Sequence, residues 1–171
     1  MSPAKTKSAK QVATAYFDAI GNRDLDGMEA CWKPDGLGRI HGMIELRMPK
    51  TYRPWFGNLF RAFPDFEMSV IDLVAYGDKA AVRWGATGTF TGPAKFEGLS
   101  PTGRRIAMEG LDLLTIEDGL ITENYAYTNA AELARQLGAM PAAGSVGERA
   151  TLAAVNARTA AKQKVKDLRD R

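Results

Sequence analysis

Few side chains in this sequence have a type and spacing that could do chemistry. On the last predicted strand, alternation places Tyr125, Tyr127 and Asn129 on one face, and Asp112 lies on the strand before it. A carboxylate among leucine, tryptophan and phenylalanine side chains would have a raised pKa, because burial disfavours its charged form. Such a group suits a general base that works near neutral pH. The alternative is a structural carboxylate paired with Arg83 or with a backbone donor.

The only histidine and the only cysteine are weaker candidates for a catalytic role. His41 is either a general acid or substrate donor at the mouth of a pocket, or a loop histidine bound to the backbone. Cys31 has no second cysteine to pair with, and its surroundings predict a buried, inert thiol. No set of histidine, cysteine and carboxylate residues has metal-ligand spacing, so we expect no metal ion.

Helical spacing of apolar residues comes first in the chain. It predicts a helix over residues 8–20 with Ser8 as N-cap, then a shorter helix that starts at Asp24 or Asp26 and runs through Trp32. A third helix carries Pro54 in its first turn, where proline is tolerated. Its apolar stripe predicts a core wall that could also form one side of a pocket, through Trp55, Phe56, Leu59, Phe60 and Phe63.

From residue 66 onward the apolar period changes to two. Residues 66–76, 80–90, 105–116 and 120–129 read as strands joined by turns or a loop, and a short strand is expected within 36–48. We therefore predict an α+β domain over residues 8–144, with helices on one face of a strongly curved antiparallel sheet. Such a cone-shaped arrangement encloses a cavity between the third helix and the inner face of the sheet. Residues 145–171, rich in Ala, Lys and Arg, are predicted to be a basic helical extension.

The net charge of +3 is unevenly distributed. Residues 1–10 carry +3 and residues 145–171 carry +4, so the remainder of the chain carries −4. Because a DNA-binding domain spreads basic residues over its folded surface, nucleic acid is not an expected partner. No apolar run approaches the roughly 20 residues of a membrane span, and the first ten residues do not resemble a signal peptide. We expect a cytoplasmic protein that does not bind membranes.

Seven short motifs, in order and spacing, carry a resemblance to a known family: "GNRDLDGM", "FPDF", "GDKAAVRW", "GTFTG", "SPTGRRI", "EGLDLLTIEDGLI" and "LARQLG". Over roughly residues 10–140 the chain resembles the SnoaL-like polyketide cyclases, or ester cyclases, of the nuclear transport factor 2-like superfamily. The resemblance implies a cone-shaped α+β fold with an interior pocket, and a homodimer formed through the outer face of the sheet. It also implies an intramolecular aldol ring closure on a polyketide ester, without metal or cofactor.

The resemblance also gives expectations for individual residues. Asn129 stands where the cyclases have a catalytic aspartate, and Phe90 where many relatives have a histidine, so two titratable groups are replaced. It suggests that Asp112 and Asn129 both face the cavity. A carboxamide can donate and accept hydrogen bonds but cannot exchange a proton at neutral pH.

Two functions follow from these expectations. The first is an enzyme of the cyclase or isomerase type that acts on a small hydrophobic carbonyl compound, with Asp112 as the base. Asn129, His41 and a tyrosine would assist, and the expected pocket lining is Trp55, Leu59, Trp84, Phe90, Tyr125 and Tyr127. The alternative is a protein of the same fold that holds a hydrophobic ligand without turning it over.

Overall fold

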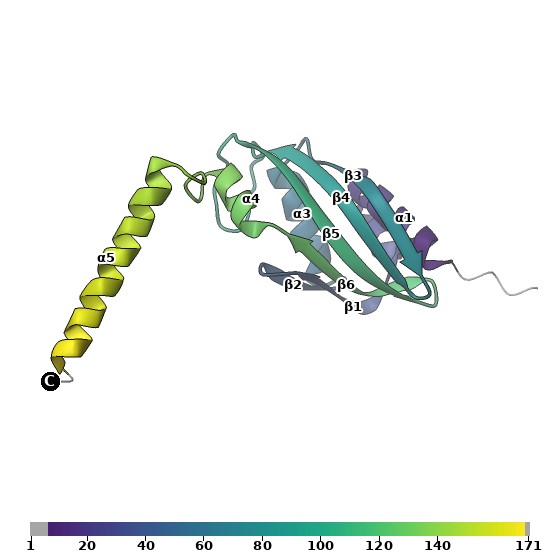
Figure 1. Cartoon of the computed structure of the whole chain (residues 1–171). Helices are drawn as coiled ribbons and strands as arrows, with labels where there is room; N and C mark the ends of the chain where they lie inside the picture. The colour runs from purple at the N-terminus through teal and green to yellow at the C-terminus, as the bar shows by residue number, and fades with distance from the viewer. Residues whose placement is uncertain (1–6, 170–171) are drawn as a thin grey trace, which may run out of the picture.

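A computed structural model of the chain describes residues 7–169 (Figure 1). Most of the basic N-terminal decapeptide, and residues 170–171 of the predicted C-terminal helix, lie outside the described part. The elements in chain order are α1 (Ala9–Gly21), α2 (Leu25–Ala30), β1 (Trp32–Ile40), β2 (Ile44–Arg47), α3 (Tyr52–Ala62), β3 (Glu67–Tyr76), β4 (Lys79–Thr89), β5 (Arg105–Glu117), β6 (Leu120–Thr128), α4 (Ala130–Leu137) and α5 (Val146–Arg169).

The strands form one six-stranded sheet in the order β2-β1-β6-β5-β4-β3. All neighbouring strands are antiparallel except β1 and β6, which are parallel. The long strands β3 to β6 curve together, and α1 packs against β3, β4 and β5 on the concave side (Figure 1). The predicted α+β class, with helices on one face of a curved sheet, is confirmed.

The N-terminal helices begin where the sequence predicts. Ser8 caps α1 through a capping box with Gln11, so two backbone donors at the helix start are satisfied reciprocally. Asp24 caps α2 by accepting a hydrogen bond from the Gly27 amide at 3.0 Å. Each helix therefore carries its own start signal in the sequence.

The prediction that the second helix continues through Trp32 is wrong. Helix α2 ends at Ala30, and Trp32 begins β1, so the chain has two strands where one was expected. Pro34 lies inside β1, in the irregular part of its pairing with β6 between Trp32 and Leu37. Proline is tolerated there because it has no N–H to donate to a regular ladder.

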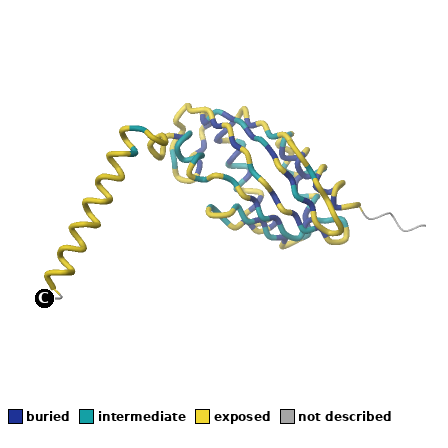
Figure 2. The backbone as a smooth tube through the Cα atoms, viewed as in Figure 1, coloured by how far each residue is buried: buried dark blue, intermediate teal, exposed yellow. Residues whose placement is uncertain are grey.

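Burial divides the protein into a folded body and an exposed helix (Figure 2). The body holds the core, whose largest fully buried side chains include Tyr16, Phe63, Phe90 and Met28. Helix α5 stands away from the body and buries none of its residues (Figures 1 and 2). Its position matches the predicted helical extension. None of the helices in residues 7–169 combines the length and apolar character that a membrane crossing requires.

The convex face of the sheet exposes several large apolar side chains. Val74, Leu111, Leu113 and Tyr127 keep between 43% and 62% of their surface exposed. Val74, Ala81 and Leu113 lie in register across β3, β4 and β5, which makes the apolar area continuous over neighbouring strands.

Candidate active site

A cavity of about 120 Å³ lies between α1, α3 and the inner face of the sheet. Its lining is mostly aliphatic and aromatic. Apart from Arg39, whose guanidinium pairs on the outer face of the sheet, seven of the lining residues carry polar side-chain atoms: Tyr16, Tyr52, Trp55, Trp84, Asp112, Asn124 and Thr128. A few polar groups in an otherwise apolar hollow are the usual composition of a small-molecule site.

Asp112 is the carboxylate of this cavity. It lies on β5, and only 5% of its surface is exposed. The indole Nε1 of Trp84 donates to its Oδ1 at 2.7 Å, and Nδ2 of Asn124 donates to its Oδ2 at 2.6 Å. Burial raises the pKa of Asp112 from 3.8 to about 6, although the hydrogen bonds from Asn124 and Trp84 oppose the rise. The carboxyl group can therefore exchange a proton near neutral pH.

The contact between Trp84 and Asp112 depends on a glycine. Gly110 lies directly opposite Trp84 in the β4–β5 register. A Cβ atom at residue 110 would lie 2.2 Å from Cζ2 of the indole, far inside van der Waals contact. The missing side chain thus leaves the space that the indole occupies on its way to the carboxylate.

Asn124 contributes a free acceptor as well as a donor. It is 5% exposed, and its Nδ2 is committed to Asp112. Within the described residues, its Oδ1 is buried and has no hydrogen-bond partner. An unpaired buried acceptor is costly in a folded protein, so this oxygen is available to a ligand that can donate.

Two phenols line the cavity from the helices. Tyr16 on α1 and Tyr52 on α3 are 1% and 3% exposed, and their hydroxyl groups share a hydrogen bond. Burial, as the largest cause, raises the pKa of both phenols well above its ordinary value, and the charge of Asp112 raises both further. Both hydroxyls therefore stay protonated at physiological pH.

Of the residues expected at the site, the structure brings four to the cavity. Asp112, Trp55, Leu59 and Trp84 all line it. Trp55 and Leu59 come from α3, on the side opposite the sheet, as the apolar stripe of that helix indicates.

The prediction that Asn129 reaches the cavity is wrong. Asn129 is the N-cap of α4, and its side chain accepts a hydrogen bond from the Glu132 amide at 3.0 Å. The parity of β6 explains the error, because Asn124, Ala126 and Thr128 are the residues of this strand that line the cavity. Residue 129 has the opposite parity and is exposed. An amide serves well at a helix N-cap, so the residue has a structural reason to be asparagine.

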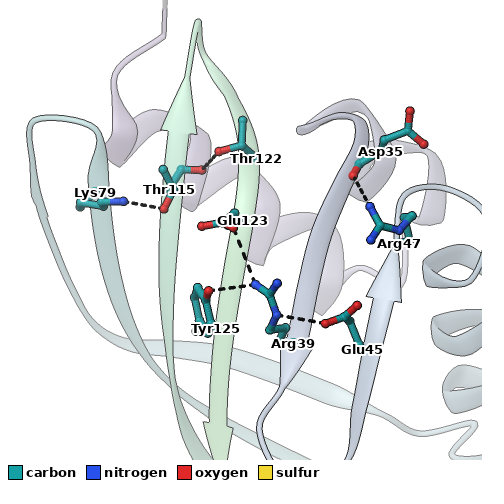
Figure 3. A network of polar contacts seen from close by, with 9 residues as sticks. All are labelled: Asp35, Arg39, Glu45, Arg47, Lys79, Thr115, Thr122, Glu123 and Tyr125. Carbon is teal, nitrogen blue, oxygen red and sulfur yellow. Dashed lines mark hydrogen bonds and ion pairs between the residues drawn. The ribbon is translucent and has the colours of Figure 1, made fainter.

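Tyr125 and Tyr127 also face outward, so their expected place in the pocket lining is wrong. Tyr125 accepts a hydrogen bond from Nη1 of Arg39 at 2.9 Å and lies under its guanidinium, 5.0 Å from ring centre to Cζ (Figure 3). Arg39 also pairs with Glu45 at 3.1 Å and Glu123 at 3.7 Å (Figure 3). These contacts form a polar network on the outer face of the sheet.

His41, Phe90 and Arg83 also lie away from the positions predicted for them at the cavity. His41 is exposed in the turn after β1, and its ring lies 5.0 Å from that of Tyr127 on the outer face. Phe90 is fully buried and stacks on Phe63 at 5.0 Å, so it belongs to the core rather than to the cavity lining. Arg83 pairs with Glu109 at 2.7 Å, so the alternative in which it pairs with Asp112 is wrong.

Sequence reasoning missed four polar residues of the cavity: Tyr16, Tyr52, Asn124 and Thr128. A weak signal existed for Tyr16 and Asn124. Tyr16 lies on the apolar face of the first helix, where a hydroxyl needs a partner. Asn124 is one residue out of phase with the tyrosines of β6, which places it on the same face of the sheet as Asp112.

Comparison with known proteins gives the family. AclR of Streptomyces galilaeus, a proposed hydroxylase, is 25% identical, with a TM-score of 0.68 over 90% of this chain and 96% of that one. TsrD of Streptomyces laurentii is 26% identical, with a TM-score of 0.67 over 80% and 99% of the two chains. A Catenulispora acidiphila protein with a ketosteroid isomerase-like fold is 16% identical, with a TM-score of 0.63 over 77% and 95%, and shares the fold.

Among curated proteins, none matches this chain. The sequence model of the SnoaL-like polyketide cyclases matches residues 10–137, three quarters of the chain and all elements from α1 to α4. The resemblance carried by the seven motifs is confirmed, and the chain belongs to the SnoaL-like polyketide cyclase family.

Proposed function

We propose that the protein is an acid–base enzyme of the cyclase or isomerase type that acts on a compact hydrophobic carbonyl compound, with Asp112 as the base. One observation carries the proposal: a carboxyl group with a pKa of about 6 lies inside an apolar cavity. A base is most effective when its pKa lies near the working pH, because it is then ionised and still able to hold a proton.

The proposed step is proton abstraction next to a carbonyl. The carboxylate of Asp112 takes the proton, the C–H bond breaks, and its electron pair delocalises into an enolate. In a cyclase, the enolate carbon attacks a second carbonyl carbon of the same molecule. A C–C bond forms, and the new alkoxide takes the proton back from Asp112. In an isomerase, the proton returns to a different carbon. Either course needs proton transfer alone.

The volume of the cavity supports a compact substrate. An apolar cavity of about 150 Å³ takes a molecule the size of benzene. The cavity here measures about 120 Å³, somewhat less than that, so the conformation described leaves room for a body of one ring at most.

Hydrogen–deuterium exchange tests the proposal without knowledge of the natural substrate. One-ring ketones and β-keto esters would be incubated with the full-length protein in D₂O, and loss of the α-proton signal would be followed by NMR. We expect exchange above the buffer rate, rising with pH through about 6 as Asp112 ionises. Asp112→Asn should slow it by about 10²- to 10⁴-fold.

Asp65→Asn is the matched control, because Asp65 is an exposed carboxylate that is bound to Thr89 and does not line the cavity. Equal exchange rates in wild type and Asp112→Asn would contradict the proposal.

A second function has one observation in its favour. Both oxygens of Asp112 are already hydrogen-bonded, as in a structural carboxylate that serves a ligand-binding protein. Tight binding of a one-ring ketone with exchange no faster than in buffer would favour this function.

A further inference from the structure

We propose that the paired hydroxyls of Tyr16 and Tyr52 form a donor site that binds the carbonyl oxygen of the substrate and stabilises negative charge on it. The inference deepens the proposed function, since it assigns the group that would polarise the carbonyl while Asp112 removes the proton.

The two hydroxyls together hold one more proton than the hydrogen bond between them uses. Each hydroxyl has one proton to donate and two lone pairs to accept with. Within residues 7–169, each of the two phenol oxygens is hydrogen-bonded to the other, and one proton serves that bond. The second phenol proton is left without an acceptor in the described part of the chain. The pair is therefore a donor that lacks an acceptor.

A third donor lies beside the pair and adds to the excess. The indole of Trp32 is 5.8 Å from the ring of Tyr16 and 5.4 Å from that of Tyr52, between ring centres. Its Nε1 is buried and, among the described residues, makes no hydrogen bond of good geometry, but it lies close enough to both phenol oxygens to lower the pKa of each. An indole N–H can only donate. Even with the indole N–H directed at a phenol oxygen, one hydroxyl proton of the cluster has no acceptor among the described residues, so the cluster can donate to a ligand.

The position of the pair relates it to the proposed base. The two phenols line the same cavity as Asp112, but they come from α1 and α3, whereas Asp112 comes from the sheet. A one-ring ketone between helices and sheet would meet donors on one side and a base on the other. This is the arrangement that enolisation requires.

The chemistry of the phenols suits this role. Their pKa values are raised by burial and by the charge of Asp112, so they donate hydrogen bonds rather than ionise. A donor held in a dry cavity stabilises an enolate oxygen more than it does in water, because little solvent screens the interaction. A hydrogen bond between two phenols also strengthens the outward donation of the one that accepts, since each bond in a chain polarises the next.

The experiment uses acetophenone labelled with ¹³C at the carbonyl as the probe. The infrared stretching frequency of the bound carbonyl reports its hydrogen bonding, and α-deuteration by NMR reports proton transfer. In the full-length wild-type protein the frequency should lie below that of acetophenone in a hydrocarbon solvent. In Tyr16→Phe/Tyr52→Phe it should return toward the hydrocarbon value, and α-deuteration should fall by about 10²- to 10³-fold.

The control variant removes a phenol oxygen that lies outside the cavity. Tyr125→Phe deletes a phenol hydroxyl on the outer face of the sheet and should leave the carbonyl frequency unchanged. The single variants Tyr16→Phe and Tyr52→Phe each keep one donor and should give intermediate frequencies. They also serve as the measurement if the double variant does not fold.

The outcomes separate the two proposals. A lowered carbonyl frequency in wild type that is lost in the double variant supports the donor site, even if Asp112→Asn exchanges protons as fast as wild type. An equal frequency in wild type and the phenylalanine variants overturns the donor site, whatever the dependence on Asp112. Failure of acetophenone and its ring-substituted relatives to bind wild type at millimolar concentration would overturn it as well.

Discussion

The pH dependence of unfolding offers a direct test of the environment of Asp112. Its pKa is raised from 3.8 to about 6 in the folded protein, chiefly by burial. Because the pKa of Asp112 is higher in the folded than in the unfolded protein, its protonated carboxyl favours folding. This contribution to the free energy of unfolding is complete below pH 3.8 and is lost as pH rises through about 6. The shift is about two pKa units at 1.36 kcal/mol each, or about 3 kcal/mol in total.

The measurement compares wild type with Asp112→Asn by urea unfolding at several pH values from 4 to 8. The asparagine cannot ionise, and its amide faces a donor, so the variant carries a penalty that does not change with pH. The free energy of unfolding of wild type minus that of the variant should therefore fall by about 2.4 kcal/mol between pH 4 and 7, and stay nearly level above pH 7.

Asp65 provides a control of opposite sign. Its pKa is lowered, chiefly by hydrogen bonds from the Thr89 side chain and amide, so its contribution is lost as pH falls. The free energy of unfolding of wild type minus that of Asp65→Asn should therefore become smaller as pH falls. If the Asp112 difference were constant from pH 4 to 7, its carboxyl would have an ordinary pKa, and the reasoning about the cavity would be refuted.

Three further predictions concern the rest of the molecule. We expect a homodimer formed through the outer sheet face, so Leu111→Lys/Leu113→Lys should halve the mass found by light scattering; an unchanged mass would argue against that interface. A chain that ends at Ser145 should lose less than about 1 kcal/mol of unfolding free energy in urea, because α5 buries no residue; a larger loss would show that α5 supports the body. Phe90→His should cost about 2 to 4 kcal/mol in the same assay without increasing deuterium exchange, because residue 90 is packed on Phe63 in the core.

The fold could be predicted because its signals are local. Ser8 and Asp24 each mark the start of a helix with a side chain that caps it. The change of apolar period from about four to two marks the transition to strands, and hairpin turns imply antiparallel neighbours. The segment around Pro34 was misjudged because β1 gains its pairing from β6, nearly 90 residues later in the chain.

The site was harder to predict because it depends on phase and on long-range contact. Asp112 was assigned to the inner face correctly because the family resemblance implied it, whereas the alternation along β5 only separates Asp112 from the exposed Leu111 and Leu113. Asn129 was assigned to that face because its family position suggested a catalytic role, although it lies past the end of β6 and caps the next helix. The Tyr16–Tyr52 pair joins two helices separated by 36 residues, and no local pattern indicates which hydroxyls will meet.

The close fit between Trp84 and Gly110 has an evolutionary consequence. A methyl group at residue 110 would overlap the indole, so the two positions cannot drift independently. A lineage that gained alanine at residue 110 would first need a smaller side chain at residue 84. It would then lose the Nε1 donor to Asp112, and with it one of the two hydrogen bonds that hold down the pKa of the carboxyl. A substitution at Gly110, which has no side chain of its own, would in this way change the pKa of Asp112, two residues further along the chain.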